Sequence, residues 1–114
     1  MTGFTCPCCG YLVFSSPPGT YEICPICGWE DDISQLRFVS MDGGANELSL
    51  IDAQRNFLKR SLKDELVFQG YIKDSDWRLL DVGRDDIEVV ESGKDYGLSY
   101  PKDSVDLYYW RAKK

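Results

Sequence analysis

The sequence contains no histidine among its 114 residues. Histidine is the general base of Ser-His-Asp and Cys-His catalysis and a frequent ligand of catalytic zinc, so all of these schemes are excluded. No phosphate-binding loop, dinucleotide-binding glycine motif or G-x-S-x-G motif occurs either. Adjacent acids such as Asp85 and Asp86 would diverge on a strand or turn, which makes them a poor acid–base pair. We therefore expect a protein that is not an enzyme and has no catalytic residues.

Basic side chains and long apolar runs are also scarce. The chain has 13 Lys and Arg against 19 Asp and Glu, a net charge of −6, which argues against nucleic acid as the main partner. The longest apolar runs, such as residues 11–14, are too short to span a membrane. The sequence does not begin with a basic segment followed by an apolar stretch, which is the pattern of a signal peptide. We expect a cytoplasmic protein that binds neither nucleic acid nor membranes.

What the sequence does contain is five cysteines in its first quarter, at positions 6, 8, 9, 24 and 27. An odd, clustered set without a secretion signal is unsuited to a disulfide framework. Residues 6–10 and 24–28 both follow the pattern C-P-x-C-G, which gives the spacing C-x2-C-x14-C-x2-C. This spacing is close to the usual patterns of structural zinc sites. The predicted ligands of one Zn(II) ion are Cys6, Cys9, Cys24 and Cys27.

We expect each C-P-x-C-G segment to form a tight turn, called a knuckle below. Its proline restricts φ after the first ligand, and its glycine permits a positive φ after the second, so that backbone N–H groups point at the sulfurs. Between the knuckles, residues 11–14 are β-prone, residues 15–20 favour a turn, and residues 21–23 return. This order predicts a zinc ribbon, in which a β-hairpin carries the two knuckles.

Four cysteine ligands would close the coordination shell, whereas a catalytic zinc keeps one position open. The predicted role of the metal is therefore to stabilise the fold. Iron is the rival metal, because the same knuckles suit a rubredoxin-like electron carrier. The fifth cysteine, Cys8, has no Lys or Arg near it in residues 1–36, so nothing favours its thiolate. We expect it to be a small side chain at the knuckle tip or a substitute ligand.

Several separated motifs together carry a resemblance. In chain order they are residues 6–10, 21–32, 43–46 and 49–50, followed by Ala53 and Asn56. Over about residues 4–60, the chain resembles the bacterial cysteine-rich CPCC domain family. The resemblance implies a bacterial origin and a metal-binding ribbon but no defined reaction. Such small proteins are often encoded near interbacterial toxins, which suggests an immunity role.

The segment after the second knuckle is acidic and begins with a tryptophan. It is either a tryptophan that covers the cysteines beside a solvated loop, or a contact surface for a basic partner. Residues 1–48 carry six acidic residues and one basic residue, a net charge of −5, to which a Zn(Cys)4 centre would add −2. Such a field would attract a cationic protein. The predicted partner contacts are Trp29, Glu30, Asp31, Asp32 and Trp110.

The remaining chain predicts one helix followed by strands. Ser49 and Asp52 resemble a capping box, and apolar residues then recur at helical spacing until Gln69-Gly70. Residues 86–91 and 105–111 are predicted as antiparallel strands. The pattern of residues 77–82 fits either a helical turn or a strand. The predicted fold class is α+β, with a zinc-ribbon subdomain (residues 1–33), one central helix and C-terminal antiparallel strands. Residues 34–114 form an α+β body that packs with the ribbon as a single domain, and we expect a monomer.

These features favour a non-enzymatic zinc protein that acts through protein–protein binding. The predicted function is that of an immunity protein that neutralises a cationic bacterial toxin, such as a nuclease effector. Two alternatives stay open: a rubredoxin-like redox protein and a nucleic-acid-associated zinc ribbon.

Overall fold

The computed structural model describes residues 3–59 and 70–111. Its first half contains two short strands, β1 (Phe4–Thr5) and β2 (Leu12–Phe14), and two α-helices, α1 (Ile33–Arg37) and α2 (Leu50–Lys59). Its second half contains two 3₁₀ helices, η2 (Gly97–Ser99) and η3 (Ser104–Leu107). One longer helix with a two-stranded antiparallel sheet confirms the α+β class. No helix in the described part of the chain has the length and apolarity needed to cross a bilayer.

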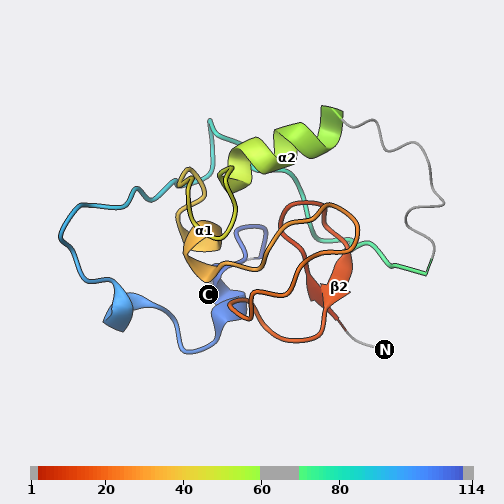
Figure 1. Cartoon of the computed structure of the whole chain (residues 1–114), viewed down its shortest axis with the longest axis horizontal. Helices are drawn as coiled ribbons and strands as arrows, with labels where there is room; N and C mark the ends of the chain where they lie inside the picture. The colour runs from red at the N-terminus through yellow and green to blue at the C-terminus, as the bar shows by residue number, and fades with distance from the viewer. Residues whose placement is uncertain (1–2, 60–69, 112–114) are drawn as a thin grey trace.

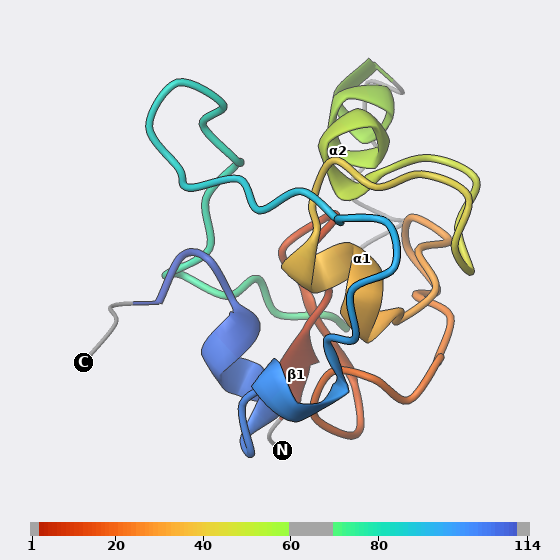
Figure 2. The ribbon, with the colours of Figure 1, turned by 90° about the vertical axis from the view of Figure 1, so that its left-hand side faces the viewer.

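The cysteine-bearing loops lie between α2 and the small sheet (Figure 1). After residue 70 the chain passes back beneath α2, loops outward without regular structure, and returns as η2 and η3. Figure 2 shows η3 beside α1, and these two elements are in contact. The C-terminal part therefore closes over the first half, although most of it has no helix or strand.

The hairpin predicted between the knuckles is wrong. β2 pairs with β1, on the other side of the first knuckle, with Phe4 opposite Phe14. Residues 21–24 pair in the same way with residues 29–31, through bonds that include Tyr21 N–H to the Asp31 carbonyl at 3.0 Å. Each knuckle is thus closed by its own flanking segments, because a tight turn brings its own ends together before more distant strands can pair.

The predicted helix start is confirmed. α2 begins at Leu50, and the Ser49 hydroxyl accepts a hydrogen bond from the Asp52 N–H at 3.2 Å. Leu50 is fully buried, but Leu58, one of the apolar residues that recur at helical spacing, is 57% exposed, and Gln54 is buried instead. The predicted helix end at Gln69-Gly70 lies outside the described residues, except for Gly70. The apolar residues predicted to continue the helix beyond Lys59 also lie outside them.

The predicted C-terminal strands are absent from the described residues. Residues 86–91 are irregular, and both Val89 and Val90 are exposed. Residues 104–107 form η3, in which the Asp103 carboxylate accepts from the Val105 N–H and so starts a helical turn. Tyr108 and Trp110 do share one side, with stacked rings 4.4 Å apart. Alternating apolar residues predicted strands here, but in the part of the chain that the structure describes no neighbouring strand offers them a hydrogen-bonding edge.

The core is built around the cysteines. Cys6, Cys9 and Cys24 are fully buried, together with apolar side chains that come from both halves of the chain: Phe14, Trp29, Leu36, Leu50, Tyr108 and Trp110. The Tyr108 hydroxyl donates to the Thr5 carbonyl at 3.1 Å and so joins the two ends of the described chain. The first 33 residues therefore share one core with later segments.

Candidate metal centre

The two knuckles have the same backbone structure. In the first, the Gly10 N–H donates to the Cys6 carbonyl (2.8 Å) and the Cys6 N–H to the Tyr11 carbonyl (2.9 Å). In the second, Gly28 and Cys24 make the equivalent bonds, at 2.9 and 2.8 Å. Gly10 and Gly28 have φ values of +85° and +83°, a conformation that favours glycine. The C-P-x-C-G pattern thus encodes a turn that projects both of its cysteines to one side.

The four predicted ligands come together at one point. Their sulfur atoms all lie within 4.8 Å of one another. The Cys6 and Cys27 sulfurs are 3.6 Å apart, and those of Cys9 and Cys24 are 3.7 Å apart. Four sulfurs placed tetrahedrally at 2.3 Å from one ion would be separated by about 3.8 Å. The donors therefore fit a four-coordinate thiophilic ion, and these distances are too long for disulfide bonds.

Ionisation of the cluster favours a bound cation. Burial raises the pKa of the Cys6 thiol well above its ordinary value. Hydrogen bonds from neighbouring thiols lower the pKa of Cys27, and the bond with Cys24 has the largest effect. Without a positive charge, the four sulfurs cannot all be thiolates in so small a volume, because their charges repel. An ion that removes this repulsion would hold all four as thiolates and release protons on binding.

Hydrogen bonds from inside and outside the knuckles hold them in place. The Ile26 N–H donates to the Cys24 sulfur at 3.3 Å, the kind of contact that stabilises a thiolate ligand. The Pro7 carbonyl, inside the first knuckle, accepts from the Gln54 side-chain amide (2.9 Å) and from the Trp77 indole N–H (3.0 Å). The first knuckle is therefore fastened by more than its own turn.

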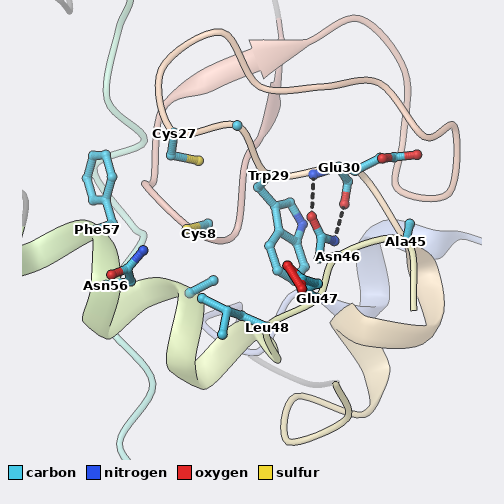
Figure 3. A pocket seen from close by; sticks show the side chains of 12 residues that line it. Cys8, Cys27, Trp29, Glu30, Ala45, Asn46, Glu47, Leu48, Asn56 and Phe57 are labelled. Carbon is cyan, nitrogen blue, oxygen red and sulfur yellow. Dashed lines mark hydrogen bonds between the residues drawn. The ribbon is translucent and has the colours of Figure 1, made fainter. Parts of the chain in front are cut away.

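Cys8 lies outside the group of four but next to it. Its side chain is buried, and it contacts Cys27 closely enough that a hydrogen bond between them, together with burial, raises the pKa of Cys8. A raised pKa disfavours the thiolate form of Cys8. It lines a pocket together with Cys27 (Figure 3).

Most of the predicted partner contacts are buried. Trp29 and Trp110 are 3% and 9% exposed, and Asp31 and Asp32 are 2% and 5% exposed. Among the described residues, neither indole N–H has a hydrogen-bond partner. Of the five, Glu30 is the one with a half-exposed side chain. A partner that contacts this segment would therefore meet Glu30 first.

The two buried aspartates have structural roles. Asp31 accepts hydrogen bonds from Gly19 and Thr20, yet burial raises the pKa of its carboxyl. Asp32 caps α1 by accepting from the Ser34 N–H at 2.8 Å, and its second oxygen accepts from the Ala45 N–H at 3.0 Å. Helix α1 was not predicted, although an aspartate with a glutamine three residues later is a recognised helix start.

A polar network beneath the acidic segment was not predicted either. Gln35 is fully buried, and its amide nitrogen donates to three carbonyls, those of Met41, Asn46 and Leu48, at 3.0–3.2 Å. The Asn46 side chain accepts from the Glu30 N–H and donates to its carbonyl, both at 2.8 Å (Figure 3). A glutamine is usually exposed, so its residue type carries no sequence signal for burial.

A pocket of about 430 Å³ opens beside the candidate metal centre. Its walls are the second knuckle, the loop of residues 45–48 and the first turns of α2. Figure 3 shows the side chains of Trp29 and Asn46 on one side of this space and those of Cys27 and Phe57 on the other. Because Cys27 is only half-buried, this pocket gives access to one edge of the sulfur cluster.

A family model described as "Cysteine-rich CPCC" matches residues 4–68, more than half of the chain and both knuckles. No curated protein matches the sequence.

Proposed function

Because the chain belongs to the cysteine-rich CPCC family, and because its knuckles bring four sulfurs together, we propose that it is a non-enzymatic, zinc-stabilised protein that binds a basic protein. The observation that carries the metal assignment is the pair of sulfur separations, 3.6 and 3.7 Å. Cys6, Cys9, Cys24 and Cys27 would hold the ion. With four thiolates the shell is closed, so the ion would stabilise the fold and leave no position for a substrate.

Zinc and iron are distinguished by a direct measurement. The protein purified without added metal should be colourless and contain one zinc per chain. A red protein containing iron would overturn the zinc assignment and support the rubredoxin-like alternative, which the N–H···S contact at Cys24 would also suit.

Charge supports a basic protein partner. Residues 1–48 have a net charge of −5, and a Zn(Cys)4 centre would add −2 at the same end of the chain. Of the acidic residues there, Glu30 is half-exposed and Asp42 and Glu47 are exposed. An unpaired negative surface accelerates encounter with a cationic protein, and this acceleration falls as salt is added.

The specific form that we propose is an immunity protein for a cationic bacterial toxin, such as a nuclease effector. Co-expression of the chain should restore growth of cells that produce a basic toxin encoded beside its gene. The purified pair should bind each other with an association rate that falls as salt rises. No protection and no binding would overturn the immunity role.

Nucleic-acid binding remains the third possibility. Arg55 and Lys59 are exposed on α2, although Arg55 already lies 3.8 Å from Asp52. Saturable binding of DNA or RNA at low salt would favour this function over protein binding.

A further inference from the structure

The segment of residues 86–91 has the side chains of a β-strand but no strand to pair with. Ile87, Val89 and Val90 are β-branched, and such residues favour extended backbone. Among the described residues, no hydrogen bond reaches a main-chain N–H or C=O group of residues 86–90. An extended segment with unpaired donors and acceptors can add to another strand. The sequence preference for a strand is therefore not satisfied within the described part of the chain.

The segment is fastened on each side of its centre. Ile87 packs against the core, and Arg37 bonds both carboxylate oxygens of Glu88 at 3.0 Å. At the other end, the Glu91 N–H donates to the Tyr96 hydroxyl at 2.9 Å. These contacts leave the intervening main chain free to bond. Because the ends are already held, less entropy is lost when a partner strand pairs with the segment.

The centre of the segment faces solvent. Val89 is 65% exposed and Val90 is 42% exposed. In Figure 1 this light-blue part of the chain forms the left-hand edge of the molecule, away from the small sheet. An arriving strand would therefore find apolar side chains to cover as well as main-chain groups to bond.

Charge determines what kind of strand fits. The segment contains Asp86, Glu88 and Glu91 but no Lys or Arg. Asp86 has no ion-pair partner among the described residues, and the pair of Glu91 with Lys94, at 3.5 Å, is exposed. Antiparallel pairing of two copies, centred on the segment, would place Asp86 of one copy opposite Glu91 of the other. Like charges in such a pair are destabilising, so the segment disfavours a second copy and favours a basic strand.

We propose that residues 86–91 pair as a β-strand with an exposed, basic edge strand of the protein partner. The partner must supply the edge of a sheet, because two isolated strands are only marginally stable in water. Main-chain hydrogen bonds would provide affinity, and Lys or Arg side chains opposite Asp86 and Glu91 would provide specificity. The proposal rests on the proposed function and adds the place and the mode of the contact.

A basic hairpin peptide tests the proposal without a known partner. The probe is a disulfide-closed hairpin whose outer strand is Lys-Val-Lys-Val-Lys, and the metal-loaded chain is titrated with it and followed by amide NMR and hydrogen exchange. The expected result is a saturable shift at residues 86–91 and slower exchange of alternate amides there, because alternate residues of a strand bond the same neighbour.

The matched control peptide carries N-methyl groups on the outward amides of the same strand. It keeps the charge but cannot donate main-chain hydrogen bonds, and it should bind about tenfold more weakly. Equal binding of the two peptides, or unchanged exchange at residues 86–91, overturns the proposal.

Two double substitutions at the exposed valines test main-chain pairing from the other side. Val89→Pro with Val90→Pro removes one N–H group from each edge of the segment and should weaken hairpin binding about tenfold or more. Val89→Thr with Val90→Thr keeps both N–H groups and the β-branched shape and should weaken binding less than about threefold. Equal effects of the two pairs would contradict pairing through the main chain.

Charge variants test the preference for a basic strand. Asp86→Asn with Glu91→Gln should weaken hairpin binding about fivefold. Asp76→Asn with Glu47→Gln removes the same two charges from exposed positions elsewhere and should leave binding unchanged. If both pairs act alike, the basic strand is not recognised here. Metal content and amide spectra establish that each variant is folded.

The remaining outcomes also decide the proposal. A dimer of the chain alone, with slowed exchange at residues 86–91, would assign the segment to a second copy and overturn it. If the chain binds its basic protein partner but the proline variant binds it equally well, the strand assignment fails and the proposed function stands. If no basic protein binds, the proposed function fails, and the hairpin titration still decides whether the segment pairs with a basic strand.

Discussion

At the scale of single residues, buried polar side chains organise the surroundings of the sulfur cluster. Gln35 is 0% exposed and Gln54 3% exposed, and each bonds groups that are distant in sequence. Removal of Gln35 would leave the carbonyls of Met41, Asn46 and Leu48 without this donor. Removal of Gln54 would leave the Leu80 N–H without its acceptor. Such a loss costs more than the bond itself contributes. A glycine, Gly44, lies directly over Gln35 and Asp32. Its lack of a side chain lets the loop approach both of them.

Gly44→Ala should destabilise the protein by about 1–3 kcal/mol because the new methyl group would overpack this contact. Its Cβ would lie 2.7 Å from the Asp32 carboxylate and 2.9 Å from the Gln35 side chain. Urea denaturation of the metal-loaded protein measures the change in free energy of unfolding. The matched control is Gly83→Ala, whose Cβ would meet nothing nearer than 3.5 Å. The expected change there is below about 0.5 kcal/mol. Equal stability of the two variants would contradict the prediction.

At the scale of elements, α1 positions the C-terminal segment through one arginine. Arg37, in its last turn, bonds both carboxylate oxygens of Glu88 at 3.0 Å and the Ser99 hydroxyl at 2.9 Å. Its guanidinium also lies over the rings of Tyr96 and Tyr100, at 5.1 and 4.6 Å. The Arg37 hydrogen bonds lower the pKa of Glu88. The Arg37 side chain thus attaches residues 88–100, which contain no strand, to α1.

Arg37→Lys should loosen residues 88–100 while leaving the metal centre intact. Lysine keeps the charge but loses the paired bonds to Glu88 and the planar contact with the tyrosines. Amide hydrogen exchange in this segment should accelerate about fivefold or more. Arg55→Lys, at an exposed and weakly paired position, is the control and should leave exchange unaltered. Unaltered exchange in the Arg37 variant would show that the segment is held by other contacts.

At the scale of the whole molecule, the sulfur cluster and the core are one structure. Three of the four predicted ligands are fully buried, among side chains from both halves of the chain. Metal ligation in small proteins contributes on the order of 10 kcal/mol of apparent folding free energy. We therefore expect metal binding and folding to be coupled throughout the chain.

Removal of the ion by a chelator should unfold the chain well beyond the knuckles. The measurement is near-ultraviolet circular dichroism, which reports the packing of the buried Trp29, Tyr108 and Trp110. Lowering the pH should have the same effect, since burial raises the pKa of Cys6 and protons then compete with the ion for the sulfurs. An unchanged spectrum after chelation would contradict the coupling.

Two neighbouring cysteines provide a matched pair for this experiment. Cys6→Ser should reduce the metal content to below one ion per chain and lower the midpoint of thermal unfolding. Cys8→Ser, in the same knuckle but outside the group of four, should retain the ion. Loss of metal in both variants would assign Cys8 a role as a ligand.

The sequence by itself determined the two knuckles and the start of α2. Each depends on residues within about five positions of one another: Pro and Gly around the paired cysteines, and Ser49 before its helix. It also determined which four cysteines would meet, since two equivalent turns offer two ligands each.

Only the tertiary structure decided how the strands pair and which acidic side chains face solvent. The Asp31 and Asp32 carboxylates are buried because backbone N–H groups of Thr20 and Ala45, more than ten residues away, bond them. The prediction of C-terminal strands was wrong for a related reason. A strand needs a hydrogen-bonding edge that another part of the chain supplies. Local turns follow from neighbouring residues, whereas burial and pairing depend on partners that only the folded chain brings near.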